Sequence, residues 1–157
     1  MRQLDTFVDI DAPAARVWQV LTDLPRYRDW NPFIVQIDGT CRTGERVAVQ
    51  MHIPGKGFQR YKVQLTSVDA PRVFAWLGHF HVRGLIDGDH AFELSARPQG
   101  GVRLRQRENF SGLLVPFVWA GFIQRHLLPC FEALNRNLKA YCEGQPLPVA
   151  LPPSSSP

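Results

Sequence analysis

The chain has 157 residues, a length typical of one domain, and such a domain buries roughly two thirds of the surface that its unfolded chain exposes. Its hydrophobic content of 45% and charged content of 20% are ordinary for a soluble globular protein. The formal net charge is +4, but the basic residues are nearly all arginine and are scattered along the chain, which argues against a nucleic-acid-binding surface.

Targeting and membrane signals are weak. The first residues, MRQLDTFVDI, lack the apolar stretch of a secretory signal, and the longest apolar run, LLVPFVWAGFI at 113–123, is shorter than the roughly 20 residues that span a bilayer. The cysteines form no CxxC motif and are odd in number, so we expect reduced thiols at Cys41, Cys130 and Cys142. These features predict a cytoplasmic protein without a transmembrane segment.

The N-terminal part predicts a strand followed by two short helices. Polar and apolar residues alternate in QLDTFVDID at 3–11, as in a strand. In DAPAARVWQVLTDL at 11–24 the period becomes helical, Pro13 suits the first turn, and one apolar stripe contains Val17, Trp18 and Leu21. Pro25 ends this helix, and a short second turn or helix closes before Pro32, where we expect the Asn31 side chain to hold the loop.

Residues 33–111 carry an almost continuous strand pattern. The turn sequences TGE, PGKG, DAPR and RPQGG separate the strands, and connections this short indicate an antiparallel meander. We expect six strands, near 33–40, 46–53, 58–69, 72–80, 85–96 and 102–111.

The C-terminal part predicts a long helix that covers the sheet. Helical spacing extends from Leu113 to Glu143, with one stripe formed by Leu127, Phe131, Leu134, Leu138 and Tyr141. Gly144 stops the helix, and Pro129 should kink or divide it. We therefore expect an α+β domain over residues 1–145 and a disordered Pro- and Ser-rich tail over 146–157.

Strand parity predicts that a histidine and a carboxylate face inward together. Arg103, Arg105 and Arg107 share one face of their strand, so the opposite face, with Gln106 and Glu108, is expected to be the inner one. The RPQGG turn fits an antiparallel register in which paired residue numbers sum to 198 or 200. His90 then lies opposite Glu108 or diagonal to it, while Asp89 and Glu93 reach the arginines on the outer face.

Several segments together resemble the START-like, or SRPBCC, superfamily, also called the Bet v 1-like or helix-grip fold, and in particular its polyketide cyclase/dehydrase-like branch. The resemblance covers roughly residues 4–144, and it implies a β-α-α-β6-α order with a curved sheet of about seven strands around the long helix and an apolar cavity between them. The segments that carry it are IDAPAARVWQVLTDLPRYRDWNPF at 10–33, TGERV at 43–47, FAWLG at 74–78, GLIDGDHAFEL at 84–94, RLRQRENFSGLL at 103–114 and FEALNRNLKAYCEG at 131–144.

Three classes of function remain open. The favoured one is non-catalytic binding of a small hydrophobic ligand that is lipid-, polyketide- or quinone-like; the alternatives are a cyclase- or dehydratase-type enzyme with a His90–Glu108 acid–base pair, and a protein-interaction module with a filled core. The sequence indicates no oligomeric state. We expect the ligand to contact Met51, Tyr61, Val63, Trp76, His90, Phe92, Gln106, Glu108, Phe110, Phe117, Gly121 and Leu128.

The apolar run at 113–123 and the pair His79 and His81 each have a structural and a functional interpretation. The apolar run at 113–123 is core, or it forms the cavity rim or contacts a membrane or a partner. His79 and His81 share one face of a strand, but with no third ligand nearby we expect two surface histidines, and neither a metal nor a cofactor.

Overall fold

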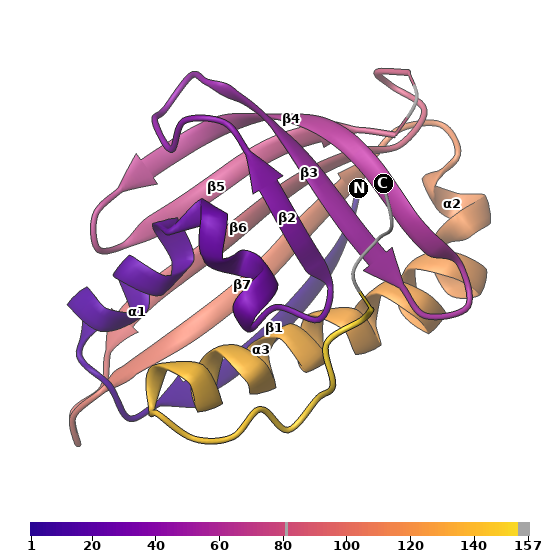
Figure 1. Ribbon diagram of the computed structural model, residues 1–157. Coiled ribbons are helices and arrows are strands. Elements are labelled where there is room, and N and C mark those ends of the chain that lie inside the picture. The colour runs from indigo at the N-terminus through magenta and orange to yellow at the C-terminus, as the bar shows by residue number, and fades with distance from the viewer. Residues whose placement is uncertain (81, 154–157) are drawn as a thin grey trace.

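A seven-stranded antiparallel sheet curves around a long C-terminal helix (Figure 1). The computed structural model describes residues 1–80 and 82–153. The predicted α+β fold and the predicted order of elements are confirmed. In chain order the elements are β1 (Arg2–Ile10), α1 (Ala14–Thr22), η1 (Leu24–Asp29), β2 (Ile34–Asp38), β3 (Arg46–Ile53), β4 (Gly57–Asp69), β5 (Val73–His79), β6 (Asp87–Ala96), β7 (Val102–Ser111), α2 (Val115–Val118), η2 (Trp119–Leu127) and α3 (Leu128–Cys142).

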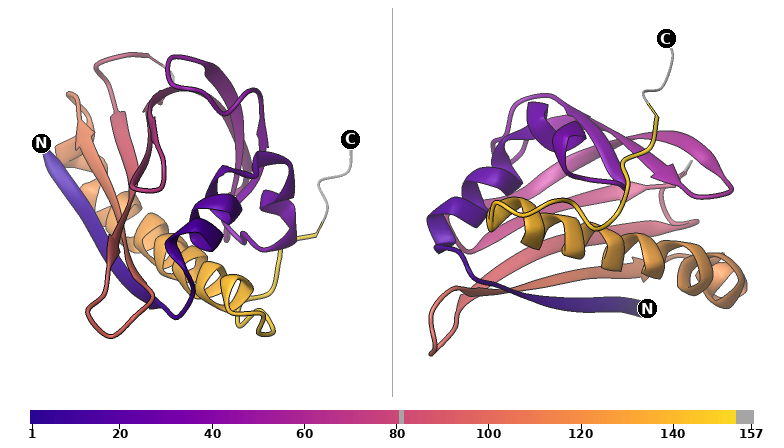
Figure 2. Two further views of the ribbon diagram at one scale, coloured as in Figure 1. Left: turned by 90° about the vertical axis from the view of Figure 1, so that its left-hand side faces the viewer. Right: turned by 60° about the horizontal axis from the view of Figure 1, so that its bottom comes forward.

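The strands lie in the order β1-β7-β6-β5-β4-β3-β2, so the first strand closes the end of the meander. The left view of Figure 2 shows the sheet bending around the helix. On β7, Val102, Leu104 and Phe110 are buried while the arginines between them are more exposed, which confirms the predicted inner and outer faces. The apolar face of β7 is therefore buried in the core. This burial fixes the pairing register, because a slip of one residue would move every side chain of the strand to the opposite face of the sheet.

The outer face carries the expected ion pairs. Arg107 lies 2.7 Å from Glu93 Oε1 and 3.7 Å from Asp89 Oδ2, and Arg105 reaches Glu93, as expected. Arg105 also pairs with Asp5, and Arg103 with Asp9, both on β1, and these two pairs were not predicted. Because these side chains are partly exposed, each pair contributes little to stability on its own. Together they keep the polar face of three adjacent strands in solvent.

The helix pair α1 and η1 closes one end of the molecule. The buried Tyr27 hydroxyl donates to Leu21 O at 2.7 Å, which ties η1 back onto α1. Asn31 Oδ1 accepts hydrogen bonds from the backbone N–H groups of Phe33 and Ile34 at 3.0 and 2.8 Å, so this side chain holds the loop before β2, as predicted.

Pro129 lies where η2 passes into α3, and the type of helix changes at this point while the backbone stays helical through Leu127 and Leu128. The preceding segment, η2, is a π-helix, which the sequence pattern did not predict. The C-terminal end of α3 is closed by Gly144 at φ +70°, again as expected.

The segment after α3 returns along the helix and contacts it at Asn137, a fully buried residue. Asn137 Nδ2 donates to Trp30 O and to Val149 O, and its Oδ1 accepts from the Val149 N–H, each at 2.9 Å. We expected a disordered tail over 146–157, and part of it, at Val149, is thus hydrogen-bonded to α3. Residues 154–157 lie outside the described residues, and the domain boundary at 145 stays a prediction.

Replacing Asn137 with alanine is expected to lower the free energy of unfolding by about 2 kcal/mol, because Trp30 O would lose its partner in the interior. Urea denaturation measures this change. The matched control is Arg136→Ala on the exposed side of the same helix, which should change the free energy by less than about 0.5 kcal/mol. Equal losses in the two variants would contradict a specific role of the Asn137 amide.

Candidate functional site

A cavity of about 360 Å³ lies between the inner face of the sheet and the segment α2–η2. Strands β3 to β7 supply most of one wall, and the helical segment supplies the other. Aliphatic and aromatic side chains dominate the wall, and only a few polar groups interrupt it. The lining residues are Phe33, Met51, Ile53, Tyr61, Val63, Trp76, Gly78, His79, Phe80, Ile86, Gly88, His90, Glu108, Phe110, Val118, Phe122, Ile123 and Leu127.

Two glycines on adjacent strands leave part of this space empty. Gly78 of β5 and Gly88 of β6 are paired in the sheet, and both line the cavity. A Cβ atom at Gly88 would lie 2.3 Å from Glu108 Oε1, so the glycine provides the room that the Glu108 carboxylate occupies. Opposite Gly78 lies its other strand partner, Val63. The two glycines thus leave room for the side chains of Glu108 and Val63 at the cavity wall.

His90 is enclosed by aromatic rings. Its ring stacks on Trp76 with a centroid distance of 4.5 Å and an interplanar angle of 2°, and it contacts Phe92 and Phe131 edge to face. Gln106 Nε2 lies 3.5 Å from His90 Nε2, and only 2% of the histidine is exposed. The imidazole is thus part of the wall and has little surface to offer a ligand.

Glu108 is the ionisable group with more access to the cavity. It is the sheet partner of His90, which confirms the register with a sum of 198. Its Oε2 lies 3.7 Å from His90 Nδ1, too long for a strong hydrogen bond but close enough for electrostatic attraction, and 17% of its side chain is exposed. A bound molecule would therefore meet Glu108 before His90.

Tyr61 adds a second polar group to the wall. Burial raises the pKa of its hydroxyl to about 12, so the group stays protonated at neutral pH. That hydroxyl donates to Gln59 Oε1, which leaves its oxygen free to accept. Glu108 and Tyr61 both present acceptor oxygens, and this arrangement suits a ligand that donates a hydrogen bond.

The structure brings together most of the strand residues that we expected at the ligand and few of the helical ones. Phe92 and Gln106 point inward but are fully buried behind the wall. The expected helical residues Phe117, Gly121 and Leu128 do not line the cavity, and Phe117 is 82% exposed. The expected residues that do line it are Met51, Tyr61, Val63, Trp76, His90, Glu108 and Phe110.

The three expected helical residues lie in different helical elements. Phe117 belongs to α2, Gly121 to the π-helix η2 and Leu128 to the first turn of α3. The lining residues are instead Val118, Phe122, Ile123 and Leu127. Gly78 and Gly88 were also missed, although they share strand parity with Trp76 and His90, which could have indicated them.

A second histidine–carboxylate contact lies at the cavity wall. His79 Nδ1 lies 2.7 Å from Asp87 Oδ1, which also accepts from Gly84 N–H. His81, the other member of the pair considered above, lies outside the described residues. Burial raises the pKa of the Cys130 thiol to about 11, so it is uncharged at neutral pH.

Within the same ranges, no group of three histidine, cysteine or acidic side chains is placed to hold a metal ion. Nor is any helix of the described chain long and apolar enough to cross a membrane.

Residues 1–143 match a family model described as "Polyketide cyclase / dehydrase and lipid transport". A search among curated proteins found no match. The match to the family model covers the sheet, the helices and every residue that lines the cavity.

Solved structures share the fold at low sequence identity. Protein Ms6760 from Mycobacterium smegmatis is 19% identical with a TM-score of 0.71, and the alignment covers 88% of this chain and 89% of that one. An AHSA1-like protein from Aeromonas hydrophila is 15% identical with a TM-score of 0.63, covering 91% and 93%. The di-domain ARO/CYC StfQ from the steffimycin biosynthetic pathway is 11% identical with a TM-score of 0.70, covering 90% of this chain and 51% of that one.

Proposed function

Since this chain belongs to the polyketide cyclase/dehydrase and lipid transport family, we propose that its cavity binds a small, mainly apolar molecule. The observation that carries the proposal is the cavity itself, which is lined almost entirely by apolar side chains. Its volume of about 360 Å³ is near the lower end of ligand pockets in proteins, roughly 300–1,000 Å³. A fused aromatic system or a short acyl chain matches this size.

The polar groups of the wall narrow the class of ligand. The acceptor oxygens of Glu108 and Tyr61 favour a molecule with a hydroxyl group, such as a phenol or a hydroquinone. The Glu108 carboxylate lies 3.7 Å from His90 Nδ1, too far for a strong hydrogen bond, so a hydrogen-bond donor from the ligand would be bound preferentially. We therefore expect a hydroxylated polyketide-, quinone- or lipid-like molecule rather than a pure hydrocarbon.

Native mass spectrometry of the protein purified from its own host tests the proposal. The expected result is a co-purifying small molecule that is released on denaturation. A second measurement uses 1-aminoanthracene, a neutral fluorescent aromatic amine, in a direct titration. An unliganded mass together with no saturable dye binding would overturn the proposal.

The Glu108→Gln variant is expected to weaken the preference for a hydroxylated ligand. The wild-type protein should bind 1-naphthol about tenfold more tightly than naphthalene, because a hydrogen bond to a charged group contributes about 1.5–3 kcal/mol before other costs. In Glu108→Gln the ratio of the two affinities should fall, because the amide oxygen accepts only a neutral hydrogen bond, and calorimetry measures both affinities. The matched control is Glu132→Gln on α3, an exposed position outside the cavity lining, which should keep the preference.

An enzyme of the cyclase or dehydratase type is a second candidate, and the contact of His90 with Glu108 favours it. In that case Glu108 would exchange a proton with the substrate while His90, 3.7 Å behind it, stabilises the carboxylate. His90→Gln separates the two candidates. If the protein is an enzyme, cyclisation of an added poly-β-ketone thioester with loss of water should be lost in His90→Gln. If the protein only binds ligands, no such reaction is expected, and the affinity of His90→Gln for 1-naphthol should change little.

A further inference from the structure

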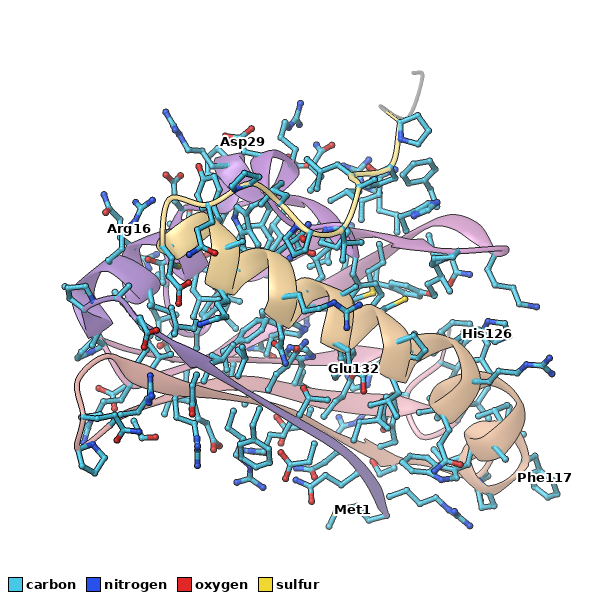
Figure 3. The ribbon with its side chains drawn as sticks, turned by 90° about the horizontal axis from the view of Figure 1, so that it is seen from below. Met1, Arg16, Asp29, Phe117, His126 and Glu132 are labelled. Carbon is cyan, nitrogen blue, oxygen red and sulfur yellow. The ribbon has the colours of Figure 1, made fainter. Side chains whose placement is uncertain are left out.

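One end of the molecule exposes large apolar side chains beside the cavity. Leu113, Leu114 and Phe117 precede or belong to α2, and they are 77%, 42% and 82% exposed; Val82, in the loop between β5 and β6, is 59% exposed. We call these four residues the apolar tip. Figure 3 shows Phe117 pointing away from the body of the protein at this end.

The two segments of the apolar tip are joined by backbone hydrogen bonds. The N–H groups of Leu113 and Leu114 donate to the carbonyl oxygens of Gly84 and Leu85, both at 3.0 Å. A Cβ atom at Gly112 would meet Leu85 O at 2.4 Å, so only glycine allows this close approach. The apolar tip is therefore a fixed surface formed by a loop and a helix start.

The apolar tip adjoins the cavity wall on both segments. Val118 and Phe122 follow it on the helical side and line the cavity, and Phe80 and Ile86 flank it on the loop side and do the same. The sequence left open whether the run at 113–123 is core, cavity rim or contact surface. In the structure, part of this run is buried and part is exposed. Its buried members include Val115, Trp119 and Ile123, whereas its first turn is exposed.

Cations surround the apolar tip, and acidic residues are sparse there. Arg83 lies within the loop, Arg125 follows on η2, and the Arg2 guanidinium lies 5.3 Å from the centre of the Trp119 ring. The turn between β3 and β4, with the exposed Lys56, is at the same end in Figures 1 and 2. Residues 80–86 and 111–131 contain no aspartate or glutamate, and the acidic residue that contacts the loop is Asp87, which accepts from the Gly84 N–H.

We propose that the apolar tip inserts into the surface of a bilayer that contains anionic phospholipid, with the surrounding arginines on the headgroups. Leucine and phenylalanine flanked by cations are the composition of segments that lie in the membrane interface. A projecting tip of four side chains is small for a stable protein contact, which buries about 800 Å² on each partner. This inference extends the proposed function, since a docked cavity could exchange an apolar ligand with the lipid.

Vesicle co-sedimentation tests the docking. The protein is expected to bind vesicles of phosphatidylcholine with phosphatidylglycerol, to bind pure phosphatidylcholine much more weakly, and to be released by salt. The double variant Leu113→Ser, Phe117→Ser should lose at least tenfold in vesicle affinity. Arg83→Gln should lose about fivefold, the equivalent of about 1 kcal/mol for each arginine near an anionic surface.

Phe7→Ser is the matched control, because Phe7 is 58% exposed but lies on β1, whose outer face carries the Asp5–Arg105 pair. It should keep full vesicle affinity. The docking is overturned if the wild-type protein ignores anionic vesicles, or if Phe7→Ser weakens binding as much as the double variant does. It is also overturned if gel filtration shows a dimer that the double variant dissociates, since a second copy would then cover the apolar tip.

The test separates docking from ligand binding. Val63→Trp, which fills the cavity, should still bind vesicles, and the Leu113→Ser, Phe117→Ser protein should still bind 1-aminoanthracene. Wild-type protein that binds vesicles but not the dye would contradict the proposed function alone, whereas wild-type protein that binds the dye but not anionic vesicles would contradict the docking alone.

Discussion

Val63→Trp is expected to lower the affinity for 1-aminoanthracene at least about 100-fold, or about 2.7 kcal/mol. Val63 faces the cavity on β4, and its partner on β5 is Gly78, which has no side chain to resist a larger neighbour. The indole would extend over this glycine into the space that the ligand needs. Because a strand accommodates tryptophan well, the backbone should stay unchanged.

The matched control for this variant is Lys62→Trp, the adjacent residue on the opposite face of the same strand. It introduces the same aromatic ring outside the cavity and should bind the dye like the wild-type protein. Thermal unfolding provides a second measurement. Filling an apolar void adds contacts, so the melting temperature of Val63→Trp should not fall. Retained dye affinity in a folded Val63→Trp protein would show that the dye binds elsewhere.

The strand part of the site could be predicted because strand geometry allows few alternatives. The arginines at 103, 105 and 107 identify the outer face of β7, and the short turn after β6 limits the register to two choices. In the register in which paired residue numbers sum to 198, Glu108 is the partner of His90. The contact of His90 with Phe92 also follows from strand parity, but its contact with Phe131 does not, because Phe131 comes from α3 and the contact depends on how the helix lies across the sheet.

The helical part could not be predicted because nothing in the residue pattern distinguishes a π-turn from an α-turn. Gly121 was expected to leave room for a ligand, whereas the residues of η2 that line the cavity are Phe122, Ile123 and Leu127. The composition of the tail also gave no indication that Val149 would be hydrogen-bonded to α3. A segment rich in proline and serine has no pattern of its own, but Asn137 on α3 supplies both a donor and an acceptor for its backbone.

Phe131→Ala is expected to lower the free energy of unfolding by about 3–5 kcal/mol, the cost of removing a fully buried phenylalanine side chain. The Phe131 side chain of α3 contacts an aromatic residue just before β2 and the imidazole on β6. Its ring centre lies 5.8 Å from that of Phe33 and 5.2 Å from that of His90, and both of these residues line the cavity. Urea denaturation measures the loss.

Phe117→Ala makes the same chemical change at a residue that is 82% exposed, and it should change the free energy of unfolding by less than about 0.5 kcal/mol. Equal losses in Phe131→Ala and Phe117→Ala would contradict the packing described for α3.

The ligand response of Phe131→Ala connects its stability to the cavity. Because the deleted ring stands between cavity-lining residues, the new space should join the existing cavity, and a bound aromatic molecule should fill part of it. A ligand that binds only the folded state raises stability with the logarithm of its concentration above the dissociation constant. Saturating 1-aminoanthracene should therefore raise the melting temperature of Phe131→Ala and leave that of Val63→Trp unchanged. If the space left by Phe131 is continuous with the ligand cavity, the dye should stabilise Phe131→Ala more than it stabilises the wild-type protein, and an equal rise in the two would contradict this continuity.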